Sequence, residues 1–154
     1  MSLIITIGPP GAGKSTWADT LAPSVCRLER DRFREAIFGS RLAYYDHPFP
    51  PNHRSYIITK AMLMVMRDWP TRDFVVSDTG LHYDAVKRFI EFYRRTHDHD
   101  VRLKVFDVDP HLLAERNRTR PEPHRIPHVE LEKAIKAFAN PRAWWRESGY
   151  RMID

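Results

Sequence analysis

The sequence predicts an α/β fold, a three-layer α/β/α sandwich in which helices cover both faces of a central parallel sheet. Short apolar runs alternate with helical patterns along the 154 residues. Such alternation is typical of parallel sheets, because each crossover between parallel strands needs a helix. A glycine-rich loop lies between the first apolar run and the first helical pattern, which indicates a phosphate-binding turn after the first strand.

The glycine-rich loop is Gly8-Pro9-Pro10-Gly11-Ala12-Gly13-Lys14-Ser15 and matches the P-loop pattern G-x-x-x-x-G-K-[ST]. Leu3–Ile7 before it is an apolar, β-branched run typical of a buried parallel strand, and Thr16–Leu21 after it can open a helix. Backbone N–H groups of such a loop and the helix N-terminus bind phosphate oxygens. We expect Lys14 to reach the β- and γ-phosphates of ATP and the Ser15 hydroxyl to bind Mg²⁺. The predicted ATP-binding residues of this region are Gly8, Pro9, Pro10, Gly11, Ala12, Gly13, Lys14, Ser15 and Thr16.

A second strand is predicted over Ser24–Glu29 and a helix over Arg30–Phe38, with Asp31 as its N-cap. The apolar face of this helix is expected to comprise Phe33, Ile37 and Phe38. Arg41–Asn52 is rich in proline and tyrosine and predicts a surface loop that borders a cleft. His53–Trp69 carries a strong helical pattern.

The next strand, Phe74–Gly80, ends in polar residues, and strand ends of this kind face the ligand crevice of an open parallel sheet. The remaining elements are predicted as a helix over Ala85–Arg95, a strand over Val101–Val108, helices over Leu113–Arg120 and Val129–Phe138, and a last strand over Tyr150–Ile153. His97-Asp98-His99-Asp100 is interpreted as a solvated turn rather than a metal site. Trp144-Trp145 is interpreted as packing, with base stacking as the sharper alternative.

Composition narrows the class of protein. The net charge is +5, which favours a polyanionic partner, although ATP alone also suits a basic cleft. Cys26 is the single cysteine, so no internal disulfide forms, and we expect it to be buried. No apolar run approaches the ~20 residues needed to cross a membrane, and the P-loop occupies the place of a signal peptide. We therefore expect a cytoplasmic protein.

Asp31 and Arg34 are the candidate acceptor residues. Asp31 follows the second strand directly, on the cleft side of the sheet, and a hydroxyl kinase needs a carboxylate there to orient the hydroxyl and take its proton. Arg34 lies one helical turn later on the same face, where it suits an anionic group beside the acceptor hydroxyl. The structural alternatives are a helix cap for Asp31 and a surface salt bridge between the two residues.

Arginines gather from Arg116 to Arg125, at a helix end and in the stiff, proline-rich loop of residues 121–127. This segment resembles the lid of small P-loop kinases, which closes over ATP, excludes water and supplies guanidinium groups to the transferring phosphoryl group. A basic solvated face is the alternative. Arg116, Arg118 and Arg120 cannot all face one way on a helix, so at least one is expected to have no catalytic role. We place the lid at about residues 116–127.

Four motifs together resemble the phage-type 5′-polynucleotide kinases, a family of P-loop phosphotransferases from bacteriophage. Ile5–Ala18 is similar to the opening of that family, and Arg30-Asp31-x-Phe33-Arg34 resembles its acceptor motif R-D-x-[YF]-R. Ser77-Asp78-Thr79 resembles its S-D-T at a strand end. Its last strand and lid are similar to Lys104–Val108, Arg116-Asn117 and Arg120. The resemblance covers almost the whole chain in the right order.

On the donor side, the resemblance implies ATP as phosphoryl donor, with Mg²⁺ as cofactor bound by Ser15. It implies that Lys14 and Arg120 stabilise the transferring phosphate and that Arg116 lies against the adenine. The activity implied is transfer of the γ-phosphoryl group of ATP to the 5′-hydroxyl end of DNA or RNA, as in nucleic acid end repair.

On the acceptor side, the resemblance implies that Asp31 is the general base. Arg34 and Thr79 would hold the phosphate 3′ of the reacting nucleoside, and Asp78 would support the metal waters or the acceptor. Gly80 departs from the family pattern, in which an asparagine follows S-D-T, so a contact from that side chain is lost.

The resemblance also bears on domain organisation. Asp107-Val108-Asp109-Pro110 lacks the Gly-Thr of the D-x-D-G-T motif of aspartate-nucleophile phosphatases, and that motif follows nowhere else. We therefore expect residues 1–154 to form a single kinase domain without a 3′-phosphatase domain. If the second domain carries the oligomer contacts of the phage enzymes, this chain is expected to be a monomer.

Two other functions stay open at this point. One is a small-molecule kinase of the same fold, acting on a nucleoside, sugar or antibiotic hydroxyl, in which Arg41–Asn52 walls off a small pocket. The other is a nucleotide-dependent switch or binding protein with slow hydrolysis. Asp31 separates these classes, because only a transferase depends on it.

Overall fold

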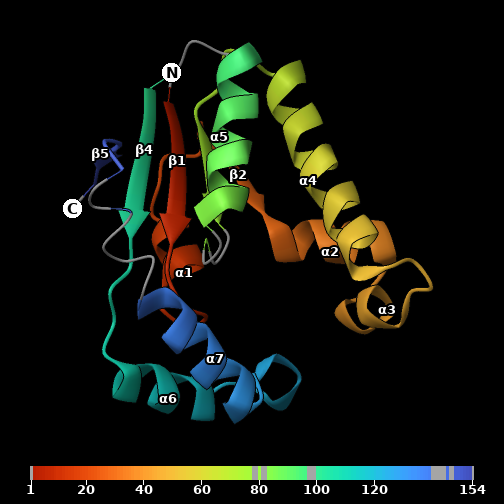
Figure 1. Cartoon of the computed structure of the whole chain (residues 1–154), viewed down its shortest axis with the longest axis vertical. Helices are drawn as coiled ribbons and strands as arrows, with labels where there is room; N and C mark the ends of the chain where they lie inside the picture. The colour runs from red at the N-terminus through yellow and green to blue at the C-terminus, as the bar shows by residue number, and fades with distance from the viewer. Residues whose placement is uncertain are drawn as a thin grey trace.

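The computed structural model describes residues 2–77, 80, 83–96, 100–139, 145 and 148–153. At its centre lies a five-stranded parallel sheet with the strand order β2-β3-β1-β4-β5 (Figure 1). The strands are Ser2–Ile7 (β1), Cys26–Glu29 (β2), Phe74–Ser77 (β3), Asp100–Val105 (β4) and Arg151–Met152 (β5). This sheet confirms the predicted α/β fold with its central parallel sheet.

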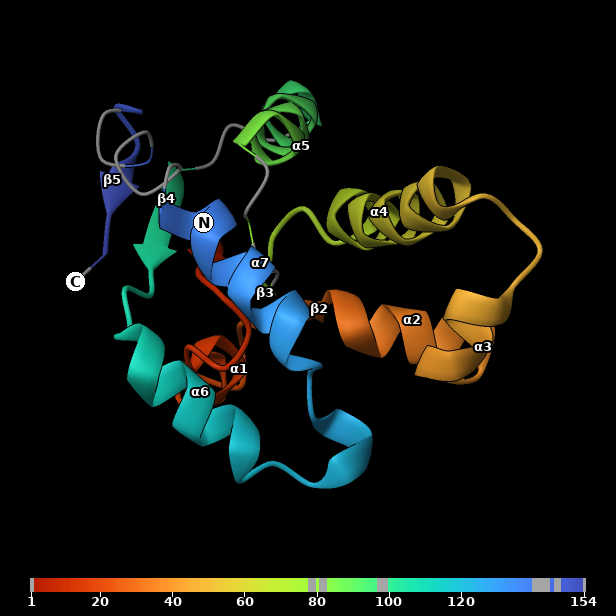
Figure 2. The ribbon, with the colours of Figure 1, turned by 60° about the horizontal axis from the view of Figure 1, so that its bottom comes forward.

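Helices lie on both faces of the sheet and beyond the carboxyl ends of its strands. They are Lys14–Ala18 (α1), Arg30–Phe38 (α2), Arg41–Asp46 (α3), Pro51–Asp68 (α4), Tyr83–Thr96 (α5), Pro110–Arg118 (α6), the 3₁₀ turn Glu122–His124 (η1) and His128–Ala139 (α7). Helices α4 and α5 lie on one face and α1 on the other, whereas α6 and α7 lie beyond the carboxyl ends (Figures 1 and 2). None of the helices in the described ranges has the length and apolar character that crossing a membrane requires.

The core forms between the sheet and helices α4 and α5. Alternate residues of β1 point into it, and Leu3, Ile5 and Ile7 are at most 2% exposed. The helices contribute apolar side chains at helical spacing, namely Ile58, Met62, Met66, Ile90 and Tyr93. Burial of these side chains attaches both helices to the strand that leads into the P-loop.

The register of the sheet brings the ends of four strands, β1 to β4, to one edge. Thr6 of β1 pairs with Ser77 of β3, and Ser77 pairs in turn with Glu29 of β2. On the other side of β1, Ile7 pairs with Val105 of β4. The strand order reverses direction at β1, and ligands of open α/β sheets bind at such a switch point. The P-loop and the start of α2 therefore lie at the same edge.

Helix α1 is shorter than the predicted helix over Thr16–Leu21, because it ends at Ala18. Arg27 of β2 donates hydrogen bonds to the backbone carbonyl oxygens of Asp19, at 3.3 Å, and of Leu21, at 3.2 Å. A side chain from a neighbouring strand thus binds the carbonyl groups that a longer helix would use. Sequence periodicity gives no sign of this contact.

The predicted surface loop over Arg41–Asn52 is wrong, because α3 occupies its first half. The Ser40 hydroxyl accepts a hydrogen bond from the backbone N–H of Ala43, at 3.0 Å, and so caps this helix. Helix α4 begins at Pro51 rather than at His53, since proline is well tolerated in the first turn of a helix.

The predicted N-cap of α2 is also wrong. The N-cap is Glu29, whose backbone is extended and whose side chain makes no capping hydrogen bond, and Asp31 lies inside the first turn. Phe33 and Phe38 pack against the core as predicted, whereas Ile37 is 40% exposed. The apolar face is therefore narrower than the sequence suggests.

Smaller differences concern the ends of other elements. Strand β4 ends at Val105, and α6 begins at Pro110 because the Asp109 carboxylate accepts a hydrogen bond from the backbone N–H of His111 at 2.8 Å. The predicted loop of residues 121–127 contains η1.

Two sequence interpretations concern single side chains. Trp145 is fully buried, which confirms packing and excludes base stacking for this residue, while Trp144 lies outside the described residues. Cys26 is half-buried and packs against the core, and burial raises the pKa of its thiol. The cysteine therefore acts as a small hydrophobic residue, though one that is less buried than expected.

We predict that Tyr93 makes the protein less stable at alkaline pH. Burial of the hydroxyl, helped by the nearby Asp73 carboxylate, raises the pKa of Tyr93 to about 12, against about 10 in an unfolded chain. The contribution of Tyr93 to the free energy of unfolding is complete below pH ~10. It is lost as the pH rises towards the folded-state pKa, because only the unfolded state then releases the proton. Urea unfolding of the wild type should show a steeper loss of stability above pH ~10 than Tyr93→Phe. Tyr56→Phe, at an exposed site, is the control, and equal slopes for wild type and Tyr93→Phe would contradict the prediction.

Candidate functional site

The P-loop begins where β1 passes closely beside the end of β4. The backbone N–H of Phe106 donates a hydrogen bond to the Ile7 carbonyl oxygen at 2.7 Å. A Cβ atom at Gly8 would lie 2.8 Å from the Phe106 carbonyl oxygen and 2.9 Å from the Phe106 Cβ. Glycine is therefore required at the first position of the loop by lack of space.

Lys14 folds back over its own loop. Its Nζ donates hydrogen bonds to the carbonyl oxygens of Gly8, at 2.9 Å, and Pro9, at 2.8 Å. Gly13 is the N-cap of α1 with a left-handed backbone, which turns the chain sharply into the helix. Because α1 has only five residues, its dipole is small, and the anion affinity of this site rests on loop N–H groups and on the Lys14 cation.

These residues fit a nucleoside triphosphate with a magnesium ion. The loop combines glycine-lined backbone with a lysine, and Ser15 and Thr16 lie exposed in the first turn of α1. Among the described residues, no group of three or more His, Cys, Asp or Glu side chains is placed to hold a metal. Residues 97–99 of the predicted solvated turn lie outside that set. A single hydroxyl suits a Mg²⁺ that arrives with phosphate oxygens and keeps several waters.

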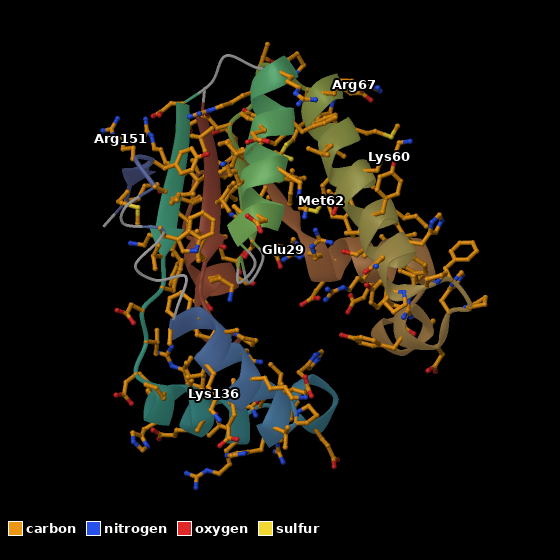
Figure 3. All side chains as sticks on the ribbon, in the orientation of Figure 1. Glu29, Lys60, Met62, Arg67, Lys136 and Arg151 are labelled. Atoms are coloured by element: carbon orange, nitrogen blue, oxygen red, sulfur yellow. The ribbon has the colours of Figure 1, made fainter. Side chains whose placement is uncertain are left out.

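Asp31 and Arg34 form an ion pair on the first turns of α2. Arg34 Nη1 donates to Asp31 Oδ1, and the Asp31 side chain is 72% exposed while that of Arg34 is 22% exposed. The carboxylate therefore faces solvent at the carboxyl edge of the sheet, and the guanidinium group lies partly under neighbouring side chains. Figure 3 shows Glu29, the residue before α2, where β2 meets this helix.

Tyr44 and Arg54 position Arg34, although the sequence analysis did not single them out. The Tyr44 ring is buried, and the guanidinium carbons of Arg34 and Arg54 lie 5.1 Å and 4.9 Å from its centroid. Arg54 Nη1 donates to the carbonyl oxygens of Tyr44 and Tyr45 at the end of α3, the second at 2.6 Å. The Tyr44-Tyr45 pair in the predicted loop was the sequence signal that could have found this contact.

Two of the lid arginines lie at the P-loop, and a third does not. Arg116 Nη1 donates to the Gly11 carbonyl oxygen at 3.2 Å, and a Cβ atom at Gly11 would lie 3.7 Å from Arg120 Nη2. Arg118 instead lines an open pocket of about 740 Å³ between α6, η1 and α7. Figure 2 shows α6 next to α1. The expectation that the alternating arginines diverge is therefore confirmed by their positions.

Asn117 holds the lid segment together, and its role was not foreseen. Its side chain is buried between α6 and the segment that leads into α7. The amide donates from Nδ2 to the Ile126 carbonyl oxygen at 2.7 Å, and its Oδ1 accepts from the Ile126 N–H at 2.9 Å. One side chain thus satisfies both backbone groups of a residue nine positions away. An asparagine inside a helical pattern is the sequence signal for such a contact.

Gly80, where the sequence departs from the pattern of the phage-type kinases, lies close to the end of β1. Gly80 has φ of 58°, and a Cβ there would lie 3.0 Å from Ile7 Cγ1. The chain after β3 therefore passes against the end of β1 without room for a side chain. Asp78 and Thr79, the other predicted acceptor residues, lie outside the described residues.

We predict that Asn117→Leu opens the lid. The variant leaves the Ile126 N–H and C=O without partners, which costs about 2 kcal/mol for the two bonds and raises the population of the open segment ~30-fold. Limited trypsin digestion should therefore cut faster after Arg125. Thr119→Ala is the control, because the Thr119 hydroxyl bonds only to the carbonyl of Arg116 in its own turn. Equal cleavage rates in wild type and Asn117→Leu would show that the amide does not hold the segment.

Comparison with solved structures shows that the chain shares its fold with P-loop kinases. A chain of the Pnkp1/Rnl/Hen1 RNA repair complex superimposes with a TM-score of 0.75 and 25% identity, over 93% of this chain and 45% of that chain. A gluconokinase from Sinorhizobium meliloti gives 0.62 and 19%, over 99% and 80% of the two chains. A sugar kinase from Janibacter gives 0.62 and 15%, over 90% and 78%. The two small-molecule kinases are similar in fold alone, and this chain spans less than half the length of its repair-complex neighbour.

These neighbours and the P-loop together support an ATP-dependent kinase, and the family implies ATP as the phosphoryl donor. They include a chain of an RNA repair complex as well as small-molecule kinases, so they share a fold and differ in what their names say of the substrate. A family model described as AAA domain matches residues 3–141. Because this match covers most of the chain, the protein belongs to the AAA domain family.

Proposed function

We propose that the protein is an ATP-dependent 5′-hydroxyl polynucleotide kinase. The observation that carries this proposal is the Asp31–Arg34 pair, a solvent-facing carboxylate beside a partly buried guanidinium group. The pair lies at the sheet edge that also carries the P-loop. A hydroxyl with an anionic group close by, as at the 5′ end of a nucleic acid strand, suits both charges at once.

In the proposed phosphoryl transfer, Asp31 acts as the general base. The carboxylate accepts the proton of the 5′-hydroxyl as the oxygen forms a bond to the γ-phosphorus of ATP. The bond between that phosphorus and the β,γ-bridging oxygen breaks, and ADP leaves with the electron pair. Before transfer, Arg34 must release the Asp31 carboxylate and bind the acceptor phosphate instead. Breaking a surface ion pair of this kind costs only about 1 kcal/mol or less.

On the donor side, Lys14 gives up its hydrogen bonds to the Gly8 and Pro9 carbonyl oxygens when ATP binds. It then donates to phosphate oxygens, which are stronger acceptors. Arg120 and Arg116 approach the same loop from the lid, where they would balance charge on the transferring group and contact the nucleotide. Mg²⁺, held by Ser15 and the phosphates, supplies further charge neutralisation when bound. We extend the proposal to one kinase domain over residues 1–154 with the lid at about 116–127.

A small-molecule kinase is the competing function, since the chain shares its fold with sugar kinases. The two functions differ in what Arg34 would bind. A polynucleotide offers Arg34 a phosphate 3′ of the reacting nucleoside, a neutral sugar offers only hydroxyl groups, and a sugar acid such as gluconate offers a carboxylate. A series of acceptors from nucleoside to oligonucleotide separates them.

We predict that the wild type transfers label from γ-labelled ATP to a 5′-hydroxyl oligonucleotide and not to its 5′-phosphorylated form. Asp31→Asn should lower kcat by about 10²- to 10⁴-fold, because the amide cannot accept the proton. Binding of ATP should be retained. Asp68→Asn is the matched control, since Asp68 is also exposed and paired with an arginine, Arg67, but lies at the far end of α4.

Either of two results would contradict this proposal. If Asp31→Asn transfers phosphate at the rate of the wild type, Asp31 is not the general base. Transfer to a sugar or nucleoside, with none to any oligonucleotide, would assign the chain to the small-molecule kinases.

We predict that the lid arginines divide by position. Arg120→Ala should reduce kcat, and Arg116→Ala should weaken ATP binding, because both side chains lie over Gly11. Arg118→Ala removes the same charge from the pocket face of α6 and should leave both parameters within about twofold of wild type. Equal losses of kcat and of ATP affinity in all three variants would mean that these parameters depend on net charge rather than on the position of each arginine.

A further inference from the structure

An unbroken row of aromatic rings runs across α2, the segment after α3, and α4. The row, called the aromatic strip below, comprises Phe38, His47, Phe49, His53 and Tyr56. Successive ring centroids are 5.1, 4.5, 5.0 and 6.5 Å apart. Three of the four contacts are edge-to-face. The fourth pair, His53 with Tyr56, is tilted, so none of the four contacts is a face-to-face stack.

The inner end of the strip reaches the candidate acceptor residues. Phe38 packs edge-to-face on Tyr44 at 5.2 Å, and the Arg34 guanidinium carbon lies 5.1 Å from the Tyr44 centroid. Arg34 pairs with Asp31. The strip is therefore continuous, through Tyr44, with the position proposed for the reacting 5′ end.

The outer end of the strip is exposed and carries a cation. Phe49 is 44% exposed and Tyr56 is 58% exposed. Lys60 Nζ lies 5.8 Å from the Tyr56 centroid, one helical turn along α4. Figure 3 shows Lys60 on the outer side of α4 and Met62, which is buried, on the side that faces the core. The fold therefore presents Tyr56 of α4 to solvent while it buries Met62 of the same helix.

Resting on the proposed function, we propose that the aromatic strip binds the single-stranded part of the polynucleotide acceptor. Bases 3′ of the reacting nucleotide stack on Phe49 and Tyr56, and Lys60 binds the backbone phosphate beside them. Exposed rings with interleaved cations suit this ligand, because every base has a π-face and every linkage a charge. The substrate class is then a single strand or a 5′ overhang, since bases inside a duplex have no free face.

The test compares acceptors of one and eight nucleotides. Probes are a nucleoside 3′-monophosphate and an oligothymidylate octamer with free 5′-hydroxyl groups, and a 5′-phosphorylated, 3′-labelled octamer for direct binding by fluorescence anisotropy. Tyr56→Ala and Phe49→Ala should each raise the Kd of the labelled octamer about 5- to 150-fold. They should also reduce the advantage in KM of the octamer over the monophosphate by a similar factor. Trp69→Ala, which removes a ring that is 57% exposed at the end of α4, is the matched control.

Two leucine variants distinguish the loss of a ring face from the loss of local packing. Phe49→Leu and Tyr56→Leu retain apolar volume and lack a ring face, so they should bind the octamer as weakly as the alanine variants. Circular dichroism and thermal unfolding check the fold of each variant. Weak binding by alanine variants and wild-type binding by leucine variants would mean that the rings serve only local packing.

The outcomes separate this proposal from the proposed function. If the wild type phosphorylates both acceptors and the strip variants bind the octamer normally, the strip proposal is overturned and the kinase function stands. If no oligonucleotide is phosphorylated but octamer binding depends on the two rings, the kinase function fails and the strip stands. Octamer binding that is no stronger than monophosphate binding in the wild type would also overturn the strip.

Discussion

The carboxyl end of β1 is approached closely by backbone on both sides, and the rest of the structure depends on this contact. Gly8 has no room for a side chain against Phe106, and Gly80 has none against Ile7. Two glycines far apart in the sequence therefore let three chain segments meet at one point. The P-loop, α6 and α2 all take their positions from this edge of the sheet, because parallel strands end there together.

Arginine side chains connect the helices around this edge through hydrogen bonds. Arg30 of α2 donates to Thr59 Oγ1 at 2.8 Å and to Ser55 Oγ at 3.3 Å, both on α4. Arg54 is only 7% exposed and bonds to carbonyl groups at the end of α3. The guanidinium group is suited to this, since it offers several donors in a fixed plane. The net charge of +5 therefore overstates the charge that is free to bind a partner.

The aspects of the fold that could be predicted are those encoded within a few residues. The P-loop motif and its preceding strand form where expected, as does the helix over Arg30–Phe38. Predictions failed where a distant side chain decides the outcome. Arg27 ends α1, and the buried Tyr44 accompanies a helix where proline and tyrosine content predicted a loop. Of the candidate site, Asp31 and Arg34 form the ion pair that was the structural alternative to an acceptor role, and Asp31 is not the N-cap.

The sequence by itself determined the class of fold and the location of the phosphate-binding loop, because hydrophobic period and turn chemistry act between near neighbours. Only the tertiary structure decided which arginines reach that loop and which side chain holds the lid. Arg116 contacts Gly11 across 105 positions of sequence, and Asn117 rather than an arginine bonds to Ile126. Such contacts depend on the parallel pairing of β1 with β4, which places α6 beside the loop, and strands so far apart in the sequence come together only in the folded chain.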